Sequence, residues 1–279
     1  MKDRAPSSSF SDVDRAVDPQ FFVNCLKEQY AKNSVLLLNK ARTLALADIR
    51  LGHIVLDAGC GTGKDVVQMA NLIGDSGHVF GMDFSQEMIT AAQAKVAALD
   101  LPVTFQQGSI YDLPFEDNFF DRCRADKTFQ HLTDPRMAVA ELIRVTKPGG
   151  KIIIADPDHD SLIIDTPYVE VNHRFTRFRS GAMAQGSIAH QLYNLFKELG
   201  LVNVDIEPLT RAYTNYEEKK VSSPYLEEIW LAHKQGVVTK EEAEKWATYL
   251  REAIANDRFL CLQTYVITTG FKPASRHSL

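Results

Sequence analysis

A glycine-rich turn after a short apolar run is the first place where this sequence could do chemistry. The run ends in Asp57 and is followed by Gly59, Gly61 and Gly63 at alternating positions. Short apolar runs bounded by glycines are typical of strands that are covered on both faces. Glycine allows a sharp turn and lets a ligand lie against bare backbone. Residues 64–70 could then start a helix whose first N–H groups face that ligand. We therefore expect a cofactor-binding turn.

The spacing of these glycines disfavours two common nucleotide-binding loops. The dinucleotide fingerprint GxGxxG would need its third glycine at position 64, where this chain has Lys64. The chain also lacks the phosphate-loop pattern GxxxxGK(S/T). A nicotinamide-dependent oxidoreductase is therefore a less favoured interpretation of the chain. A tight turn that binds no ligand is also a less favoured interpretation of this segment.

A second acid stands at the end of the next predicted strand. We expect this strand at residues 78–82, and Asp83 follows it directly. An acid about twenty residues past such a turn can accept hydrogen bonds from both hydroxyl groups of a ribose. The sequence thus predicts that Asp83 binds a cofactor that contains ribose.

Strands and helices alternate beyond this point, which is typical of a parallel doubly wound sheet. We expect further strands at 103–106, 121–126, 152–155, 202–206 and 261–271, with a turn at 147–150. We expect helices at 185–199, 224–233 and 239–255. Thr239 and Glu242 form the capping-box pattern at the start of the last helix. We expect residues 156–180 to be irregular.

Five motifs occur in a fixed order along the first half of the chain. They are LDAGCGTG at 56–63, GMDFS at 81–85, GSIYDLPF at 108–115, FQHLTDP at 129–135 and KPGG at 147–150. In these motifs the chain resembles the class I S-adenosylmethionine-dependent methyltransferases. It is most similar to the small-molecule branch that includes the ubiquinone and menaquinone methyltransferases and natural-product O- and N-methyltransferases. The resemblance runs from about residue 55 to 155 and is weaker toward the C-terminus.

The resemblance implies an α/β fold with a Rossmann-like, seven-stranded, mostly parallel sheet, helices on both faces and a helical cap or lid. The last strand should insert antiparallel beside the sixth. We expect a disordered tail at 1–14, N-terminal lid helices at 15–49 and the methyltransferase domain at 50–279. Within that domain the cap elements are expected at about 157–185 and 212–258.

The resemblance also implies that the cofactor is S-adenosyl-L-methionine. Its methionine part would lie on Gly59, Gly61 and Gly63, and Asp57 would face its ammonium group. Asp83 would hold the ribose. The remaining expected contacts are Phe84 and Met88 beside the adenine, Ser109 and Ile110 at the other edge of the adenine, and Asp126 beside the methionine. Arg124 has two interpretations, a partner of the cofactor carboxylate or an ion pair with Asp57 or Asp126.

Methyl transfer is a one-step displacement at a sulfonium carbon, so the protein mainly supplies placement. A base is needed only if the nucleophile must lose a proton. In the family a histidine at the position of His131 lies beside the methyl group, so His131 is either that base or a structural residue. Asp156 is the second catalytic candidate, because it could orient His131 or hold a substrate hydroxyl. Tyr30 and His173 are weaker site candidates.

The amino-acid composition limits the kinds of substrate and ligand that this protein is expected to bind. The 279-residue chain has a formal net charge of −5 and no prominent tract of lysine and arginine, which disfavours a nucleic-acid substrate. Its four cysteines form no CxxC pair, and the acids at 156–160 stand in one loop, so we expect no metal.

The sequence has no run that could span a membrane. We expect a cytoplasmic monomer or homodimer that methylates a small, apolar or aromatic metabolite, in keeping with secondary metabolism. A non-catalytic protein that binds S-adenosylmethionine is the alternative. The acceptor atom cannot be read from the sequence.

Overall fold

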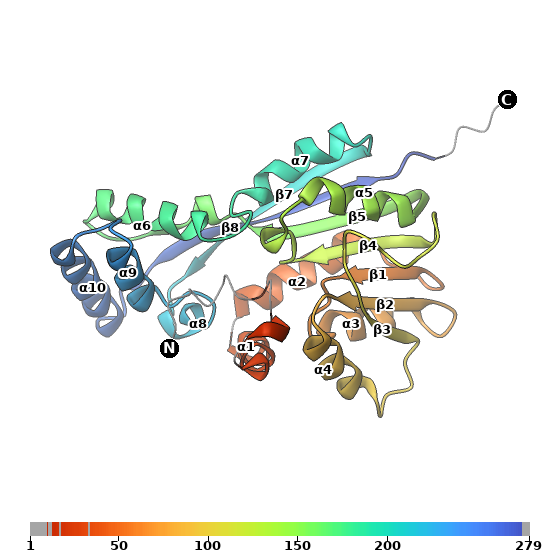
Figure 1. Cartoon of the computed structure of the whole chain (residues 1–279), viewed down its shortest axis with the longest axis horizontal. Helices are drawn as coiled ribbons and strands as arrows, with labels where there is room; N and C mark the ends of the chain where they lie inside the picture. Colours follow the sequence, from red (N-terminus) through yellow and green to blue (C-terminus); the bar gives the residue numbers. More distant parts are fainter. Residues whose placement is uncertain (1–9, 11–12, 17, 33, 275–279) are drawn as a thin grey trace.

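The computed structural model describes residues 10, 13–16, 18–32 and 34–274. Its central feature is a sheet in the order β3-β2-β1-β4-β5-β8-β6, with β7 paired to β8 (Figure 1). The strands are β1 (Ile54–Ala58), β2 (His78–Asp83), β3 (Val103–Gln107), β4 (Phe120–Asp126), β5 (Thr146–Pro157), β6 (Ile163–Ile164), β7 (Val202–Tyr213) and β8 (Cys261–Phe271).

The first five strands are parallel, and β8 is antiparallel to β5, β6 and β7. The two-residue strand β6 pairs with the start of β8, beyond the stretch that pairs with β5. Apart from β6, the sheet has the seven strands that were expected, and the last strand, β8, is inserted antiparallel beside the sixth, β7, as predicted. The fold class is therefore confirmed.

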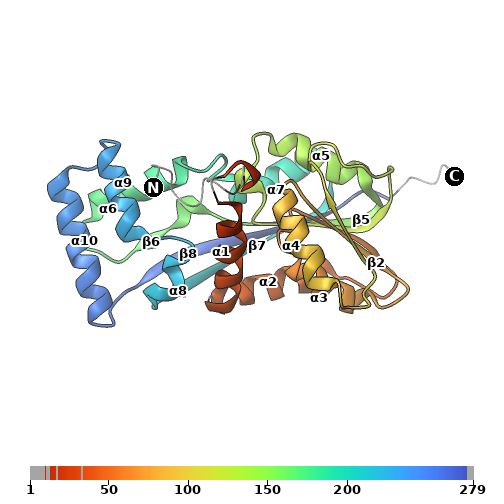
Figure 2. The ribbon, with the colours of Figure 1, turned by 60° about the horizontal axis from the view of Figure 1, so that its bottom comes forward.

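Helices cover both faces of the sheet (Figures 1 and 2). They are α1 (Pro19–Lys32), α2 (Ser34–Ala47), α3 (Lys64–Ile73), α4 (Gln86–Val96), α5 (Pro135–Val145), α6 (Val169–Gly181), α7 (Ile188–Glu198), α8 (Tyr216–Lys220), α9 (Tyr225–Lys234) and α10 (Lys240–Ala255). Leu56 and Ala58 pack in the core cluster with α5 and α7, whereas Val55 packs in the cluster with α3 and α4. Because side chains alternate along a strand, Asp57 faces the side of the sheet that α2 and α3 cover.

A separate core forms in the cap. It contains Phe175 of α6, Tyr225 of α9 and Trp246 of α10, all fully buried. Figure 1 shows these helices gathered at one end of the molecule, where the long strands β7 and β8 reach them. The cap therefore has an apolar core of its own and is joined to the sheet through these two strands.

Two local predictions were wrong. Residues 156–180 were expected to be irregular, but α6 begins at Val169. Its sequence is mostly polar, and it is held by Val171 and Phe175, which are four residues apart and both buried against the cap. The turn expected at 147–150 instead forms the start of β5, where the pairing with β4 contains a register shift between Phe120 and Arg122.

The helix caps follow the local sequence. The side chain of Asp134 accepts the backbone N–H of Met137 at 2.9 Å, which fixes the start of α5 just after His131. The capping box of Thr239 and Glu242 is present at the start of α10, as predicted.

Most of the predicted tail at 1–14 lies outside the described residues. Within it, Val13 is buried, and the carboxylate of Asp14 accepts the backbone N–H of Gln86 at 2.7 Å at the start of α4. Among the helices of the described part of the chain, none combines the length and the apolar character that crossing a membrane requires.

Candidate functional site

A cavity of about 460 Å³ lies at the carboxyl ends of the parallel strands. This is the usual place for a ligand in an open α/β sheet, and the volume suits a small molecule. Its wall comes from the glycine turn, from the ends of β2 and β4, from α1 and α2, and from cap residues such as Met183 and Lys219. All predicted site residues line it except Gly63, Asp156 and the weaker candidate His173.

Backbone hydrogen bonds hold the glycine turn against β2. The N–H groups of Gly59 and Cys60 both donate to the carbonyl of Met82, at 2.7 and 2.9 Å. The N–H of Gly61 donates to Oδ2 of Asp83 at 2.8 Å. Gly61 has a φ of +53°, a region that favours glycine. The turn therefore presents bare backbone to the cavity, as expected for a bound cofactor.

Gly63 serves packing instead. A Cβ atom there would lie 2.6 Å from Cζ of Phe105, and the residue has a φ of +70°. It precedes α3 and does not line the cavity. This glycine therefore makes room for the side chain of Phe105 on β3, and the expectation that the cofactor lies on Gly63 stays a prediction.

Asp83 has the geometry of a ribose-binding acid. Its Oδ1 accepts the N–H of Ser85 at 3.0 Å, and its Oδ2 accepts Gly61. Burial raises the pKa of this carboxyl group, although these backbone hydrogen bonds oppose the shift. Each carboxylate oxygen has further acceptor capacity, and the residue lines the cavity. These observations fit a pair of hydroxyl groups.

A buried network of charges lies beside the turn. Arg124, with 1% of its surface exposed, forms ion pairs with Asp57 at 2.8 Å, Asp65 at 2.9 Å and Asp126 at 2.5 Å. Lys40 of α2 adds contacts to Asp65 at 2.6 Å and to Asp126 at 3.5 Å. Of the two interpretations of Arg124, the structure confirms the ion pair with acidic residues of the protein.

This network sets the charge of its members. Burial raises the pKa of Asp57 to about 6, and Arg124 only partly offsets that effect. Burial also acts to raise the pKa of Asp65, but Lys40 and Arg124 outweigh it and hold the pKa below its ordinary value. The Oδ1 atom of Asp65 is buried without a hydrogen-bond partner among the described residues. Other atoms of Asp65 line the cavity.

The sequence analysis missed Lys40 and Asp65. Their signal was weak: Lys40 stands within an apolar helix, and Asp65 is an ordinary acid in a first helical turn. Tyr30 also lines the cavity, and its ring lies 4.2 Å from Nζ of Lys64. His173 is exposed on α6 and does not line the cavity.

His131 lies on the short helix η2 (Phe129–His131) and lines the cavity. Among the described residues its imidazole has no hydrogen-bond partner. Burial, with a smaller effect from Lys127, lowers its pKa to about 4. The ring is therefore neutral near pH 7 and able to accept a proton.

Asp156 forms hydrogen bonds with the backbone of η2. It is fully buried and accepts the backbone N–H groups of Phe129 at 3.1 Å and Gln130 at 3.3 Å. Burial raises its pKa well above the ordinary value. It has no contact with the imidazole of His131 and does not line the cavity. Its oxygens thus bind the backbone of η2, and the expectation that it holds a substrate hydroxyl or orients the ring of His131 stays a prediction.

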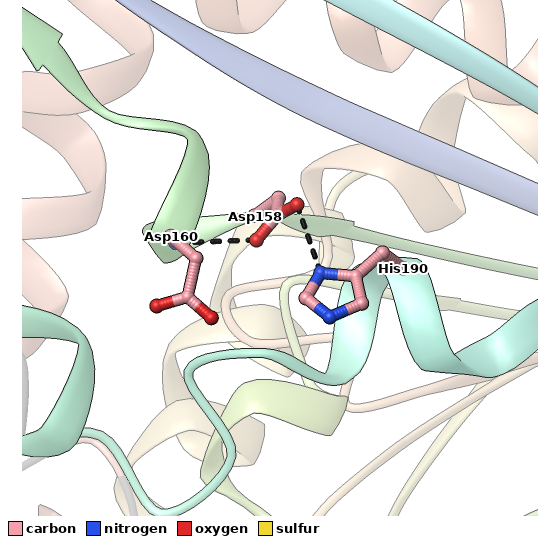
Figure 3. Close-up of side chains that lie close together, drawn as sticks. All are labelled: Asp158, Asp160 and His190. Atoms are coloured by element: carbon pink, nitrogen blue, oxygen red, sulfur yellow. Dashed lines mark hydrogen bonds and ion pairs between the residues drawn. The ribbon is translucent and has the colours of Figure 1, made fainter. Parts of the chain in front are cut away.

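A second polar cluster lies outside the cavity (Figure 3). Ligand atoms of Asp158, Asp160 and His190 lie within 4.8 Å of one another. Nδ1 of His190 is 3.0 Å from Asp158, whose carboxylate also accepts the N–H of Asp160 at 3.2 Å. Ser187 donates to Asp160 at 2.6 Å. Asp158 thereby caps the short helix η3 (His159–Ser161), and both carboxylates have hydrogen-bond partners within the protein.

A protein-family model and several known proteins are similar to this chain in sequence. A family model described as a methyltransferase domain matches residues 49–200. An uncharacterized 37.1 kDa protein in transposon TN4556 of Streptomyces fradiae is 34% identical over 223 residues. That match covers 74% of this chain and 64% of the relative, so the chain spans less than two thirds of that relative's length. A demethylmenaquinone methyltransferase of Bacillus mycoides is 29% identical over 187 residues, which cover 61% of this chain and 79% of that protein.

Solved structures share the fold. The YcgJ protein of Bacillus subtilis has a TM-score of 0.60 at 20% identity, covering 85% of this chain and 98% of its own. A phosphoethanolamine N-methyltransferase of Haemonchus contortus, in complex with phosphomonomethylethanolamine and S-adenosylhomocysteine, has a TM-score of 0.56 at 19% identity, covering 84% of this chain and 52% of its own. With the family match over more than half of its length, the chain belongs to the S-adenosylmethionine-dependent methyltransferases of class I.

Proposed function

We propose that the cavity binds S-adenosylmethionine at the ends of β1, β2 and β4, and that the protein methylates a small molecule held under the cap. The observation that carries the proposal is that one continuous cavity joins the glycine turn and Asp83 to the cap residues Met183 and Tyr213. When bound, S-adenosylmethionine supplies a methyl group already activated on a sulfonium. The protein then has mainly to place the acceptor in line and to exclude water.

Specific residues support the donor half of this proposal. Asp83 and the backbone of Gly61 would hold the ribose side, and Asp57, Asp65 and Asp126 give the floor of the cavity an acidic character. Phe84, Met88, Ser109 and Ile110 line the part of the cavity that the resemblance assigns to the adenine. Helices α1 and α2 would act as the lid, since Tyr30 and Lys40 contribute to the same wall.

We propose that His131 takes up the proton when the substrate must lose one on methylation. Its imidazole is neutral at pH 7 and lines the cavity. A base with a pKa of about 4 is weak, so it suits an acidic nucleophile better than an alcohol. Asp156 would be a positioning residue, because it fixes the backbone on which His131 stands.

The acceptor we propose is apolar or aromatic, and the enzyme is proposed to act in the cytoplasm in secondary metabolism, as a monomer or homodimer. The aromatic and thioether side chains of Tyr213, Tyr111 and Met183 on the cavity wall support an apolar acceptor. All four cysteines are free thiols, which suits a reducing compartment.

The test combines donor binding with turnover. Calorimetry would measure the affinity for S-adenosylmethionine and for NAD, and mass spectrometry would follow S-adenosylhomocysteine release with a panel of phenols, amines, carboxylic acids and quinone precursors. We expect S-adenosylmethionine to bind, Asp83→Asn to weaken it at least tenfold, and Asp158→Asn, outside the cavity, to leave it unchanged. A protein that binds this donor but methylates no member of the panel would favour the non-catalytic alternative.

A further inference from the structure

Two lysines on the acceptor side of the cavity have only neutral partners among the described residues. Nζ of Lys219 donates to Oε1 of Gln263 at 2.7 Å, and Nζ of Lys127 donates to Oε1 of Gln29 at 3.0 Å. Lys219 is only 3% exposed. Buried lysines are rare without a charged partner, because taking the ammonium group out of water is costly. Both lysines line the cavity, so a ligand can reach them.

Charge is distributed unevenly around the cavity. The carboxylates that line it are Asp57, Asp65, Asp83 and Asp126, all at the ends of β1, β2 and β4 or in the first turn of α3. The described cap residues that line it contribute Lys219 and the imidazole of His159 but no carboxylate. The donor end thus carries four carboxylates beside the cations Arg124 and Lys40, whereas the described part of the cap end carries Lys219 and no carboxylate.

The neighbouring charges at the cap end of the cavity are mostly positive. His159 lines the cavity, and its Nε2–H donates to Oε1 of Gln130 at 2.7 Å. Its pKa falls to about 3 because of burial and of the nearby charges of Arg179, Lys219 and Lys127. Glu228, whose charge acts on Lys219, is already paired with Arg179 at 2.5 Å. Neither lysine therefore forms an ion pair with a carboxylate among the described residues, and Asp126 and Asp156 act on Lys127 only through longer-range charge interactions.

Lys219 is also held in an aromatic setting. Its Nζ lies 4.4 Å from the ring centroid of Tyr213 and 5.9 Å from that of Tyr225. Such contacts keep an ammonium group in place without cancelling its charge. An incoming oxyanion would meet a fixed ammonium group in a site of low dielectric, where charge-assisted hydrogen bonds are strong.

We propose that the methyl acceptor carries an oxyanion, such as an aromatic carboxylate, and that the ammonium groups of Lys127 and Lys219 bind it. This inference rests on the proposed function and names its substrate class. An apolar body would lie against Tyr213 and Met183, with the acid group directed at the two lysines. A neutral analogue of the same shape would lose these contacts and leave the lysines unpaired.

The experiment compares matched acids and amides. The probes are benzoate, salicylate, 4-hydroxybenzoate and 1-hydroxy-2-naphthoate, each beside its carboxamide, with saturating S-adenosylhomocysteine at pH 7. We expect at least one acid to bind tenfold or more tightly than its amide by calorimetry. Lys219→Met and Lys127→Met should each remove this preference, and Lys219→Arg should retain it. Lys245→Met, an exposed surface lysine of α10, should leave it unchanged.

The possible results distinguish a failure of the proposed oxyanion site from a failure of the proposed function. If no acid exceeds its amide, or if the two Met variants keep the preference, the oxyanion site is wrong. If S-adenosylhomocysteine itself fails to bind the wild-type protein, the proposed function fails instead. The melting temperature of each variant and the retained preference of Lys219→Arg separate loss of the site from loss of the fold.

Discussion

The Nζ atom of Lys40 lies 2.6 Å from Oδ2 of Asp65, and Nη2 of Arg124 lies 2.9 Å from the same oxygen. Lys40 belongs to α2, Asp65 to the first turn of α3 and Arg124 to β4. One carboxylate therefore joins the N-terminal helices to the sheet directly beside the glycine turn. All three side chains are almost fully buried.

We expect Lys40→Met to lower the free energy of unfolding by about 3 kcal/mol, because it leaves buried carboxylates with one cation fewer. Urea denaturation followed by tryptophan fluorescence would measure this loss. Arg42→Met on the same helix is the control, since the pair between Arg42 and Glu207 is exposed. Equal losses in the two variants would contradict the role of the buried pair.

Two of the three glycines of the turn, Gly61 and Gly63, should respond differently to alanine. Gly61→Ala places a Cβ 3.3 Å from the flexible end of Leu26 and in the cavity wall. We expect it to fold, at a cost of about 1–2 kcal/mol for the left-handed backbone, and to bind S-adenosylmethionine at least tenfold more weakly in calorimetry.

Gly63→Ala should instead affect stability. Its Cβ would meet Phe105 at 2.6 Å and Ala92 at 3.0 Å. We expect a loss of about 2–4 kcal/mol from overpacking and backbone strain together, with unchanged donor affinity in the folded fraction. Weakened donor binding in Gly63→Ala, at unchanged stability, would refute this division of roles.

His131→Asn tests the base. If His131 accepts a proton, turnover should fall by about 10²–10⁴-fold, while the affinity for S-adenosylhomocysteine stays unchanged. In the wild-type protein kcat/KM should rise with pH through about 4, the pKa of His131, and level off above it. A rise centred near pH 6.5 would show that burial does not lower this pKa. Unchanged turnover would remove His131 from the base role.

Lys219 should make the protein less stable at neutral pH. Burial, aided by Arg179 and Lys127 and opposed by Cys261 and Glu228, lowers its pKa to about 8. Between this value and the pKa of about 10.4 in the unfolded chain, the unfolded state binds more protons, so stability rises with pH in that window. Below pH 8 the full cost of the buried charge remains.

Lys219→Met should therefore raise the free energy of unfolding at pH 7 by about 1–3 kcal/mol. The difference from wild type should shrink between pH 8 and pH 10.5. Thermal and urea unfolding at pH 7, 9 and 10.5 would measure it. A variant that is less stable than wild type at pH 7 would indicate that Lys219 holds the cap together rather than serving a ligand.

The elements that were predicted well carry their own local signals. The last strand has the predicted bounds, Cys261 to Phe271, because β-branched and aromatic residues fill it. The start of α10 follows from Thr239 and Glu242, which bond to each other's backbone three residues apart. Helix α6 was missed because its polar sequence is held only by the cap core.

The sequence by itself determined the sheet, the glycine turn, the position of Asp83 at the end of β2 and, through the order of its motifs, the family. These features depend on residue types and short spacings, which local sterics and nearby hydrogen bonds control. The tertiary structure alone decided that Arg124 pairs with three aspartates, that Gly63 accommodates Phe105, and that Lys127 and Lys219 meet neutral partners. Lys127 and Gln29 are 98 residues apart, and Lys219 and Gln263 are 44 apart. Contacts of this kind follow from how the helices and cap pack on the sheet, because their energy depends on burial that no local pattern records.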